Sequence, residues 1–239
     1  MAGHSKWHSI RHKKGANDAK RGKIFTKHAR LITLAARNGD DPDLNSQLRA
    51  AIDNARAENV PNDNIQRAIA KAGGAGSDTQ MFEMTYEAYG PNGIAFLIEA
   101  ITDNKNRTVT SVRTILNKNG GSLGESGSVA YMFSMKGVVS GSGDVSGDDL
   151  QMELLENGAL DIETDGDDFI IYTEPGQAVT IRNLLENKNV TVESAKTAKI
   201  AENIISVDDQ TVAEKVTRLV EKLEEDDDVT DVYTSCDLF

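Results

Sequence analysis

Residues 82–118, "FEMTYEAYGPNGIAFLIEAITDNKNRTVTSVRTILNK", decide the fold of the central part of the chain. Two runs rich in apolar residues, 82–89 and 94–101, flank "GPNG", and this arrangement predicts two strands joined by a turn. Residues 106–118 predict a helix, because apolar residues recur there at steps of three and four. We therefore expect an α/β unit in the middle of the chain.

A second α/β pattern follows further along the chain. Its order is strand, helix, strand, strand, helix and strand, which is the order of the split βαβ, ferredoxin-like plan. The predicted segments are strand 137–140, helix 148–157, strands 159–164 and 168–173, helix 176–187 and strand 190–195.

The central pattern is incomplete by itself. Its two strands, its helix and a further predicted strand at 128–133 give only ββαβ. A helix at 209–224 and a strand at 229–234 remain at the end of the chain, and they would supply the missing αβ. We therefore predict that residues 205–239 return to the central unit and that 135–204 are an insertion, although a separate tail also fits the periodicity.

The N-terminal part predicts three helices. The first spans about residues 17–38, the second follows "DDPDLNS", and the third runs from "PNDN" to the Gly73-Gly74 pair, with Asn or Asp at the starts and Gly at the ends. One face of the first helix is apolar, and we expect His28 to be a core residue. That face carries Ile24, Phe25, His28, Leu31, Ile32 and Ala35.

Together these segments predict an α/β multi-domain protein of the α+β class. An N-terminal three-helix domain is followed by two ferredoxin-like α/β domains, one inserted in the other. The expected boundaries are 1–76 for a basic arm and the helices, 77–134 plus 205–239 for one α/β domain, and 135–204 for the inserted one. "GGAGSD" is the expected linker after the helices.

Composition predicts a soluble, cytoplasmic protein. Cys236 is the only cysteine among 239 residues, so no internal disulfide can form, as expected in a reducing compartment. No apolar run approaches the roughly 20 residues that span a bilayer, and the basic N-terminus lacks the apolar stretch of a signal peptide. We expect no membrane partner.

Charge is divided sharply along the chain. Residues 4–30 hold nine Lys and Arg against one Asp, although the net charge of the protein is −12. Residues 1–71 carry 14 basic and 7 acidic side chains, a balance of +7, and the remainder carries −19. This asymmetry predicts an anionic partner at one pole, because Lys and Arg gain affinity for phosphates by releasing condensed counterions. A solvated helix face with a flexible tail is the alternative.

The candidate nucleic-acid-binding residues lie in the arm and on the basic side of the first helix. Trp7 adds a flat surface on which an unpaired base can stack. The candidates are Lys6, Trp7, Arg11, Lys13, Lys14, Lys20, Arg21, Lys23, Lys27 and Arg30.

Residues 46–72 also fit a helix-turn-helix, which any three-helix bundle can supply. The side chains expected to face outward from its second helix are Asn64, Gln66, Arg67 and Lys71.

Metal and catalytic sites are disfavoured. His4, His8 and His12 recur every four residues, but neighbouring cations oppose zinc binding. Residues 161–172 are similar to a calcium loop, yet Tyr172 stands where the bidentate Glu is required, so a hairpin turn explains them better. "GGSLGESGS" lacks the GK[ST] of a phosphate-binding loop and is expected to be a flexible, contact-making loop. We expect no enzyme activity, cofactor, metal or small-molecule substrate.

The sequence resembles the YebC family, which includes the mitochondrial translational activator of cytochrome c oxidase subunit I. The motifs that carry the resemblance are "MAGHSKW", "DAKRGKIFTK", "DPDLN", "PNDNIQRAI", "YEAYGPNG", "TDNKNRT", "GGSLGESGSVAYMF" and "DDVTDVYT". It implies a helical N-terminal domain, two α/β domains with one inserted in the other, and no enzyme activity. Members have been regarded as DNA-binding transcriptional regulators, and also as ribosome-associated factors that help translation through difficult sequences such as proline runs.

The resemblance also implies contact residues. In the arm and first helix these are Lys6, Trp7, Lys20, Arg21 and Lys23, and the loop 104–107 adds Lys105 and Arg107. The expected function is non-enzymatic regulation of gene expression through rRNA on the ribosome. The alternatives are a transcription factor that places residues 46–72 on duplex DNA and an acidic protein-interaction scaffold.

Overall fold

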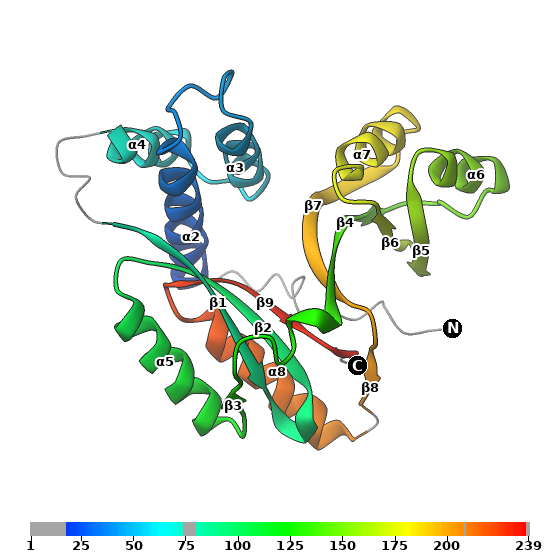
Figure 1. Ribbon diagram of the computed structural model, residues 1–239. Coiled ribbons are helices and arrows are strands. Elements are labelled where there is room, and N and C mark those ends of the chain that lie inside the picture. Colours follow the sequence, from blue (N-terminus) through cyan, green and yellow to red (C-terminus); the bar gives the residue numbers. More distant parts are fainter. Residues whose placement is uncertain (1–17, 74–79, 208, 238–239) are drawn as a thin grey trace. The chain divides into compact units, whose positions relative to one another are not determined.

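The computed structural model describes residues 18–73, 80–207 and 209–237 (Figure 1). The described chain divides into two compact units. The larger contains residues 18–73, 80–130 and 211–232, and the smaller contains 131–207, 209–210 and 233–237.

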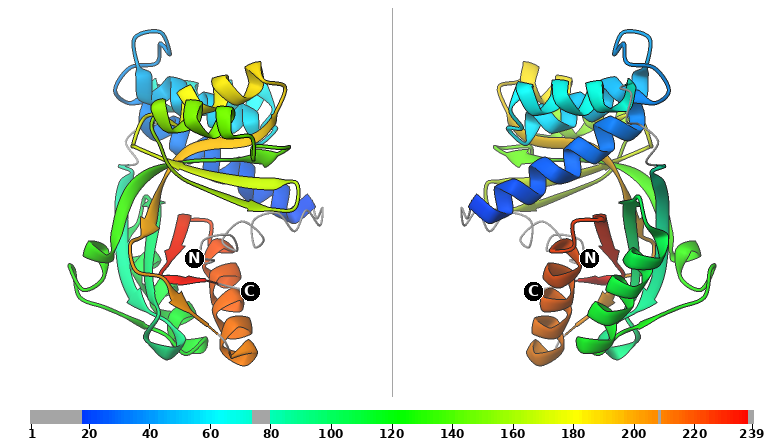
Figure 2. Two further views of the ribbon diagram at one scale, coloured as in Figure 1. Left: turned by 90° about the vertical axis from the view of Figure 1, so that its right-hand side faces the viewer. Right: turned by 90° about the vertical axis from the view of Figure 1, so that its left-hand side faces the viewer.

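Three helices open the larger unit. They are α2 (Asp18–Ala36), α3 (Ser46–Ala57) and α4 (Asn62–Gly73). Figure 2 shows α4 against α2, and the Thr33 hydroxyl donates to the carbonyl oxygen of Ala68 at 3.0 Å. The buried Asn45 joins α2 to α3, because its amide donates to the carbonyl of Ala35 at 2.8 Å while its Oδ1 accepts from the Leu48 N–H at 3.1 Å.

The core between these helices is aliphatic. Ile32 is fully buried on the predicted apolar face of α2, and His28 is buried beside it, as expected of a core histidine. The buried apolar members of this core are Ile32, Ala36, Leu48, Ile52, Ala55, Val60, Ile65 and Ala68.

The sheet of the larger unit has the strand order β3-β1-β2-β9. Its elements are β1 (Phe82–Tyr89), η1 (Pro91–Gly93), β2 (Ala95–Thr102), α5 (Lys105–Lys118), β3 (Ser122–Leu123), α8 (Gln210–Glu224) and β9 (Val229–Thr234). Strands β1 and β2 pair antiparallel from Phe82–Thr102 to Tyr89–Ala95. A side chain at Gly90 would lie 2.3 Å from the ring of Phe96, so this turn requires glycine.

The smaller unit contains a four-stranded antiparallel sheet with the order β5-β6-β4-β7. Its elements are η2 (Ala130–Met132), β4 (Phe133–Ser142), α6 (Asp148–Glu156), β5 (Ala159–Asp165), β6 (Asp168–Thr173), α7 (Ala178–Asn187) and β7 (Thr191–Ala201). This succession and strand order are those of a ferredoxin-like fold. Phe133 pairs with Ala201 at one end of the β4–β7 ladder, and a bulge interrupts the ladder at Ser140/Gly141.

Two short strands, β8 (Ile205–Ser206) and β10 (Cys236–Asp237), pair in parallel within the smaller unit. The core of the ferredoxin-like sheet lies between the sheet and its helices. Its buried members are Val139, Val145, Leu154, Ala159, Phe169, Ile171, Ala178, Ile181 and Leu185.

The predicted fold class is confirmed: the chain is mixed α+β, and its described residues contain an N-terminal group of three helices and two four-stranded sheets. One predicted strand is wrong. Residues 128–132 are not a strand, and β4 instead begins at Phe133 and includes the predicted strand 137–140. The physical reason is that backbone N–H groups of this stretch bind the carboxylate of Glu87 rather than a neighbouring strand.

The predicted domain boundaries stay a prediction, and both the arm and most of the expected linker lie outside the described residues. In the part of the chain that the structure describes, no helix is both long and apolar enough to cross a membrane.

Candidate nucleic-acid interface

The predicted basic side of α2 faces an acidic turn of the same unit. Lys23, Lys27 and Arg30 are spaced four and three residues apart, which places them on one side of the helix. We call these three residues the basic stripe. The segment opposite is residues 224–231, "EEDDDVTD", which runs from the last residue of α8 into the first three residues of β9, and we call it the acidic turn.

Each residue of the basic stripe contacts the acidic turn. The Nζ of Lys23 donates to the carbonyl oxygen of Glu225 at 2.7 Å, and the Nζ of Lys27 lies 3.2 Å from Oδ1 of Asp231. Arg30 donates through Nη1 to Oδ1 of Asp228. Lys27 and Arg30 therefore have counter-charges within the chain, and Lys23 has a carbonyl acceptor.

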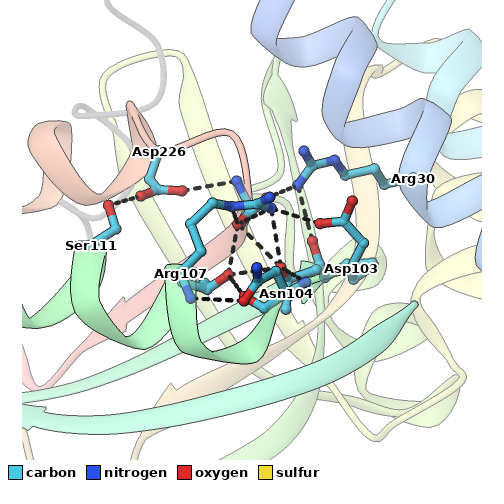
Figure 3. A network of polar contacts seen from close by, with 10 residues as sticks. Arg30, Asp103, Asn104, Arg107, Ser111 and Asp226 are labelled. Atoms are coloured by element: carbon cyan, nitrogen blue, oxygen red, sulfur yellow. Dashed lines mark hydrogen bonds and ion pairs between the residues drawn. The ribbon is translucent and has the colours of Figure 1, made fainter. Parts of the chain in front are cut away.

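Asp228 is the centre of this contact. It is 4% exposed, and its carboxylate meets side chains from α2, from α5 and from the end of β2. Arg107 places Nη2 3.0 Å from Oδ1 and 2.8 Å from Oδ2, and Thr108 donates its hydroxyl to Oδ2 at 2.6 Å. The hydroxyl of Thr102 lies 3.2 Å from the same oxygen. Figure 3 shows the side chains of Arg30 and Arg107 pointing toward one another from α2 and α5.

This environment keeps Asp228 ionised. Burial by itself would raise the pKa of Asp228, but hydrogen bonds from Thr108, Arg107 and Arg30 outweigh burial and lower the pKa to about 2. The carboxylate is thus a permanent anion under ordinary conditions, and it is compensated by two guanidinium groups.

The backbone around Asp228 is fixed as well. Its carbonyl oxygen accepts from the Ile101 N–H at 2.8 Å, and its own N–H donates to Oδ1 of Asp226 at 2.9 Å. Asp226 in turn accepts the hydroxyl of Ser111 from α5, as Figure 3 shows. The acidic turn is therefore held to β2 and α5 independently of α2.

The segment 104–107 is the start of a helix rather than a loop before one. Asn104 is the N-cap of α5, and its Oδ1 accepts from the Arg107 N–H at 3.0 Å. Lys105 is exposed, with its Nζ 4.1 Å from the centroid of the Phe82 ring, a cation–π distance. Arg107 is half-exposed and also binds Asp103 at 2.8 Å.

A second buried carboxylate shapes the glycine-rich loop. Glu87, on β1, is 9% exposed and accepts the backbone N–H groups of Gly127 at 2.6 Å and of Val129 and Ala130 at 2.7 Å. Burial raises the pKa of Glu87, but these hydrogen bonds lower it further than burial raises it. The loop is therefore fastened to the sheet by an internal anion, in contrast to the flexible loop expected from its glycines.

Comparison with known proteins places the chain in a family. Residues 5–75 match the family described as "TACO1/YebC protein N-terminal domain", and residues 81–236 match "TACO1/YebC second and third domain". The chain belongs to the TACO1/YebC family. The resemblance predicted from its motifs is confirmed.

Relatives of full length support this membership. A "Probable transcriptional regulatory protein" of Halothermothrix orenii is 45% identical over 100% of this chain and 96% of its own length. "Probable transcriptional regulatory protein YrbC" of Bacillus subtilis is 46% identical over 98% of this chain and 99% of its own. The crystal structure of the conserved hypothetical protein Aq1575 from Aquifex aeolicus superposes with a TM-score of 0.81 at 40% identity, covering 95% of this chain and 94% of that one.

The predicted contact residues of this TACO1/YebC protein fall into four groups. Lys6, Trp7, Arg11, Lys13 and Lys14 lie outside the described residues. Lys20 and Arg21 belong to the first turn of α2. Lys23, Lys27, Arg30 and Arg107 come together at the acidic turn, whereas Lys105 lies at the Phe82 ring. Their assignment to nucleic-acid contact stays a prediction.

The helix-turn-helix alternative has a partly open face. On α4, the side chains of Gln66, Arg67 and Lys71 are exposed, but Asn64 is half-buried. Arg67 donates to the carbonyl of Asp63 at 3.1 Å and to the side chain of Asn64, so its guanidinium is engaged on its own helix.

Sequence reasoning missed Asp228 and Glu87. Glu87 carried a usable signal, since a carboxylate between Tyr86 and Ala88 in an apolar strand needs donors from elsewhere. No signal in the sequence singles out Asp228, because it is one of several consecutive acidic residues. The histidines proposed and rejected as zinc ligands in the arm lie outside the described residues, and within those residues no group of three His, Cys, Asp or Glu is placed to hold a metal.

Proposed function

We propose that this protein is a non-enzymatic, nucleic-acid-binding regulator of gene expression that acts on the ribosome in the cytoplasm. It contacts rRNA and assists synthesis through difficult sequences such as proline runs. The observation that carries the proposal is the concentration of nine basic residues in residues 4–30 of a protein whose net charge is −12. Phosphates attract such a segment independently of base sequence.

RNA fits this charge division better than duplex DNA. Residues 72–239 carry a balance of −19, so most of the chain repels a wrapped polyanion and only one pole attracts it. Trp7 lies among the basic residues of the arm, and a single indole suits an unstacked base of the kind that folded RNA presents.

Neither of the two buried carboxylates is suited to general acid–base catalysis. A general acid or base must exchange its proton near the working pH. Asp228 has a pKa of about 2, and hydrogen bonds keep the pKa of Glu87 below its usual value. Both groups act as structural anions within the larger unit.

Transcriptional regulation through DNA is the second candidate. The relatives from H. orenii and B. subtilis bear the name "probable transcriptional regulatory protein". The exposed Gln66 and Lys71 on α4 are residue types that read base edges and phosphates when a helix enters the major groove.

One experiment separates these candidates. Binding to ribosomes by co-sedimentation is compared with binding to duplex DNA by gel shift, at the same physiological salt concentration. An arm variant, K6A/R11A/K13A/K14A, keeps α2 and its core intact. The control variant loses the same four charges from exposed positions on α5 and α8: R113A, K118A, K215A and R218A.

We expect the wild type to co-sediment with ribosomes and the arm variant to lose that binding. In single-stranded RNA binding, the slope of log K against log salt should fall by about 0.7 for each phosphate contact removed. Equal binding by the arm variant and the wild type would refute the proposal. Tight duplex binding without ribosome binding would establish the DNA alternative.

A further inference from the structure

The basic stripe and the acidic turn form an extended ionic contact between segments about 200 residues apart in sequence. Lys23 binds a backbone carbonyl of the turn, Lys27 binds Asp231, and Arg30 binds Asp228. The side chains of Lys27 and Asp231 are 23% and 22% exposed, so most of this ion pair is out of contact with solvent. Each residue of the stripe is therefore half-buried and has a partner on the acidic turn.

The turn presents the stripe with a chemistry similar to that of a nucleic-acid backbone. Six carboxylates stand within residues 224–231, and the oxygens that meet the stripe are anionic or carbonyl acceptors, like the oxygens of successive phosphates. A helix rises about 1.5 Å per residue, so the three basic residues meet this surface over about 10 Å.

The contact can open without leaving a buried charge unpaired. When Arg30 departs, Asp228 still has both hydrogen bonds from Nη2 of Arg107 and the hydroxyl of Thr108. The turn also stays attached to β2 and α5 through Ile101 and Ser111. When the basic stripe of α2 separates from the acidic turn, the three basic side chains become available to other partners. The acidic turn keeps its conformation.

We infer that the acidic turn is an autoinhibitory cover for the basic stripe, and that a nucleic acid must displace it to reach Lys23, Lys27 and Arg30. The inference rests on the proposed function and adds its regulation. The acidic turn lowers the affinity of the basic stripe for a polyanion that contacts the stripe alone. It is displaced when the nucleic acid is also bound by another part of the protein. An intramolecular competitor thereby disfavours indiscriminate binding to phosphate chains.

The test uses the full-length protein and a single-stranded RNA of mixed sequence, about 20 nucleotides long. In D231N, Lys27 loses the carboxylate that covers it. The matched control is D227N, which removes the same charge from an exposed position of the same turn. Both variants lose one negative charge, so any increase in RNA affinity that comes from net charge alone appears in both. The difference in affinity between them therefore measures the effect of uncovering Lys27.

We expect D231N to bind the RNA about two- to fivefold more tightly than D227N, which is the range of a partly exposed ion pair. K27A should weaken binding more in the D231N background than in the wild type, because the wild-type Lys27 is already occupied. Equal affinities for D231N and D227N, or an equal effect of K27A in both backgrounds, would overturn the inference while leaving the proposed function standing. Failure of the wild type to bind RNA would overturn both.

Discussion

Arg107 and Asp228, which are 121 residues apart in sequence, form a two-pronged ion pair at the start of α5. The Nη2 of Arg107 lies 3.0 Å from Oδ1 and 2.8 Å from Oδ2 of Asp228, and its Nε lies 3.3 Å from Oδ2. With Arg30 on the other side, the aspartate receives two guanidinium groups at a buried position. Such a group of buried charges adds little net stability over an apolar one, but removal of the central carboxylate is strongly destabilising.

Replacement of Asp228 by Asn should therefore lower the free energy of unfolding by about 3 kcal/mol, because Arg30 loses its carboxylate partner and Arg107 keeps only Asp103. The difference should depend on pH. The pKa of Asp228 is lowered from 3.8 to about 2 in the folded protein, so the unfolded chain takes up the proton first. The stabilisation is thus complete above about pH 4 and disappears as the pH falls through about 2.

The shift corresponds to about 2 kcal/mol, so the gap between the wild type and D228N should narrow by about that amount between pH 5 and pH 2. Urea denaturation followed by circular dichroism at several pH values measures this difference in the free energy of unfolding. D227N, at the exposed neighbouring position, should show no such narrowing. A gap that stays constant with pH would mean that Asp228 is not the ionised centre described above.

Thr108 tests the hydrogen bond to Asp228 separately from the charge. Its hydroxyl is buried and lies 2.6 Å from Oδ2 of Asp228, so T108V keeps the volume but removes the donor. We expect a loss of about 1–3 kcal/mol in the free energy of unfolding, since a buried acceptor loses a partner. T110V on the exposed side of the same helix should change stability by less than about 0.5 kcal/mol. Equal effects of the two substitutions would contradict the assigned role.

Glu87 should control the order of the glycine-rich loop. E87Q removes the carboxylate that holds the N–H groups of Gly127, Val129 and Ala130, so these amides should exchange with deuterium faster. Hydrogen exchange followed by NMR reports each amide separately. E83Q, an exposed position four residues earlier on β1, is the control and should leave the exchange unchanged. Unaltered protection in E87Q would show that the loop is held by other contacts.

Gly141 should tolerate no side chain. It lies at the bulge of β4, and a Cβ there would come 2.0 Å from the carbonyl oxygen of Thr191 and 2.8 Å from the ring of Phe169. G141A should therefore destabilise the ferredoxin-like sheet by about 3 kcal/mol or more, a size typical of steric strain in a packed strand. G147A, where a Cβ meets nothing within 4 Å, should stay within about 0.5 kcal/mol of the wild type. The urea denaturation midpoints of G141A and G147A, each compared with that of the wild type, test this prediction.

Most elements were predictable because their signals are local. The predicted strands 168–173 and 229–234 coincide with β6 and β9, and the helix predicted at 106–118 begins one residue earlier, at the Asn104 cap. The strand predicted at 128–133 failed for a reason no local pattern contains. Its N–H groups serve Glu87, which is about 40 residues away in sequence.

The environment of the basic stripe was hidden for the same reason. The charge pattern of the first helix predicted a basic side that contacts an anionic partner. The structure places Asp228 and Asp231 opposite that side. A sequence shows how many charges a segment holds, but long-range pairing decides which of them a ligand can reach.

The pairing of Phe133 with Ala201 has a consequence for the order of assembly. Strands β2 and β9 are neighbours, yet Thr102 and Val229 are separated by a long stretch of chain, and joining the ends of such a stretch loses entropy in proportion to the logarithm of its length. Once the ferredoxin-like sheet has folded, Phe133 and Ala201 are held next to each other. About half of the stretch between Thr102 and Val229 is then no longer flexible chain that must be closed into a loop. This lowers the entropic barrier by about 0.6 kcal/mol. Residues 133–201 therefore favour a pathway in which they fold first and β9 joins β2 late.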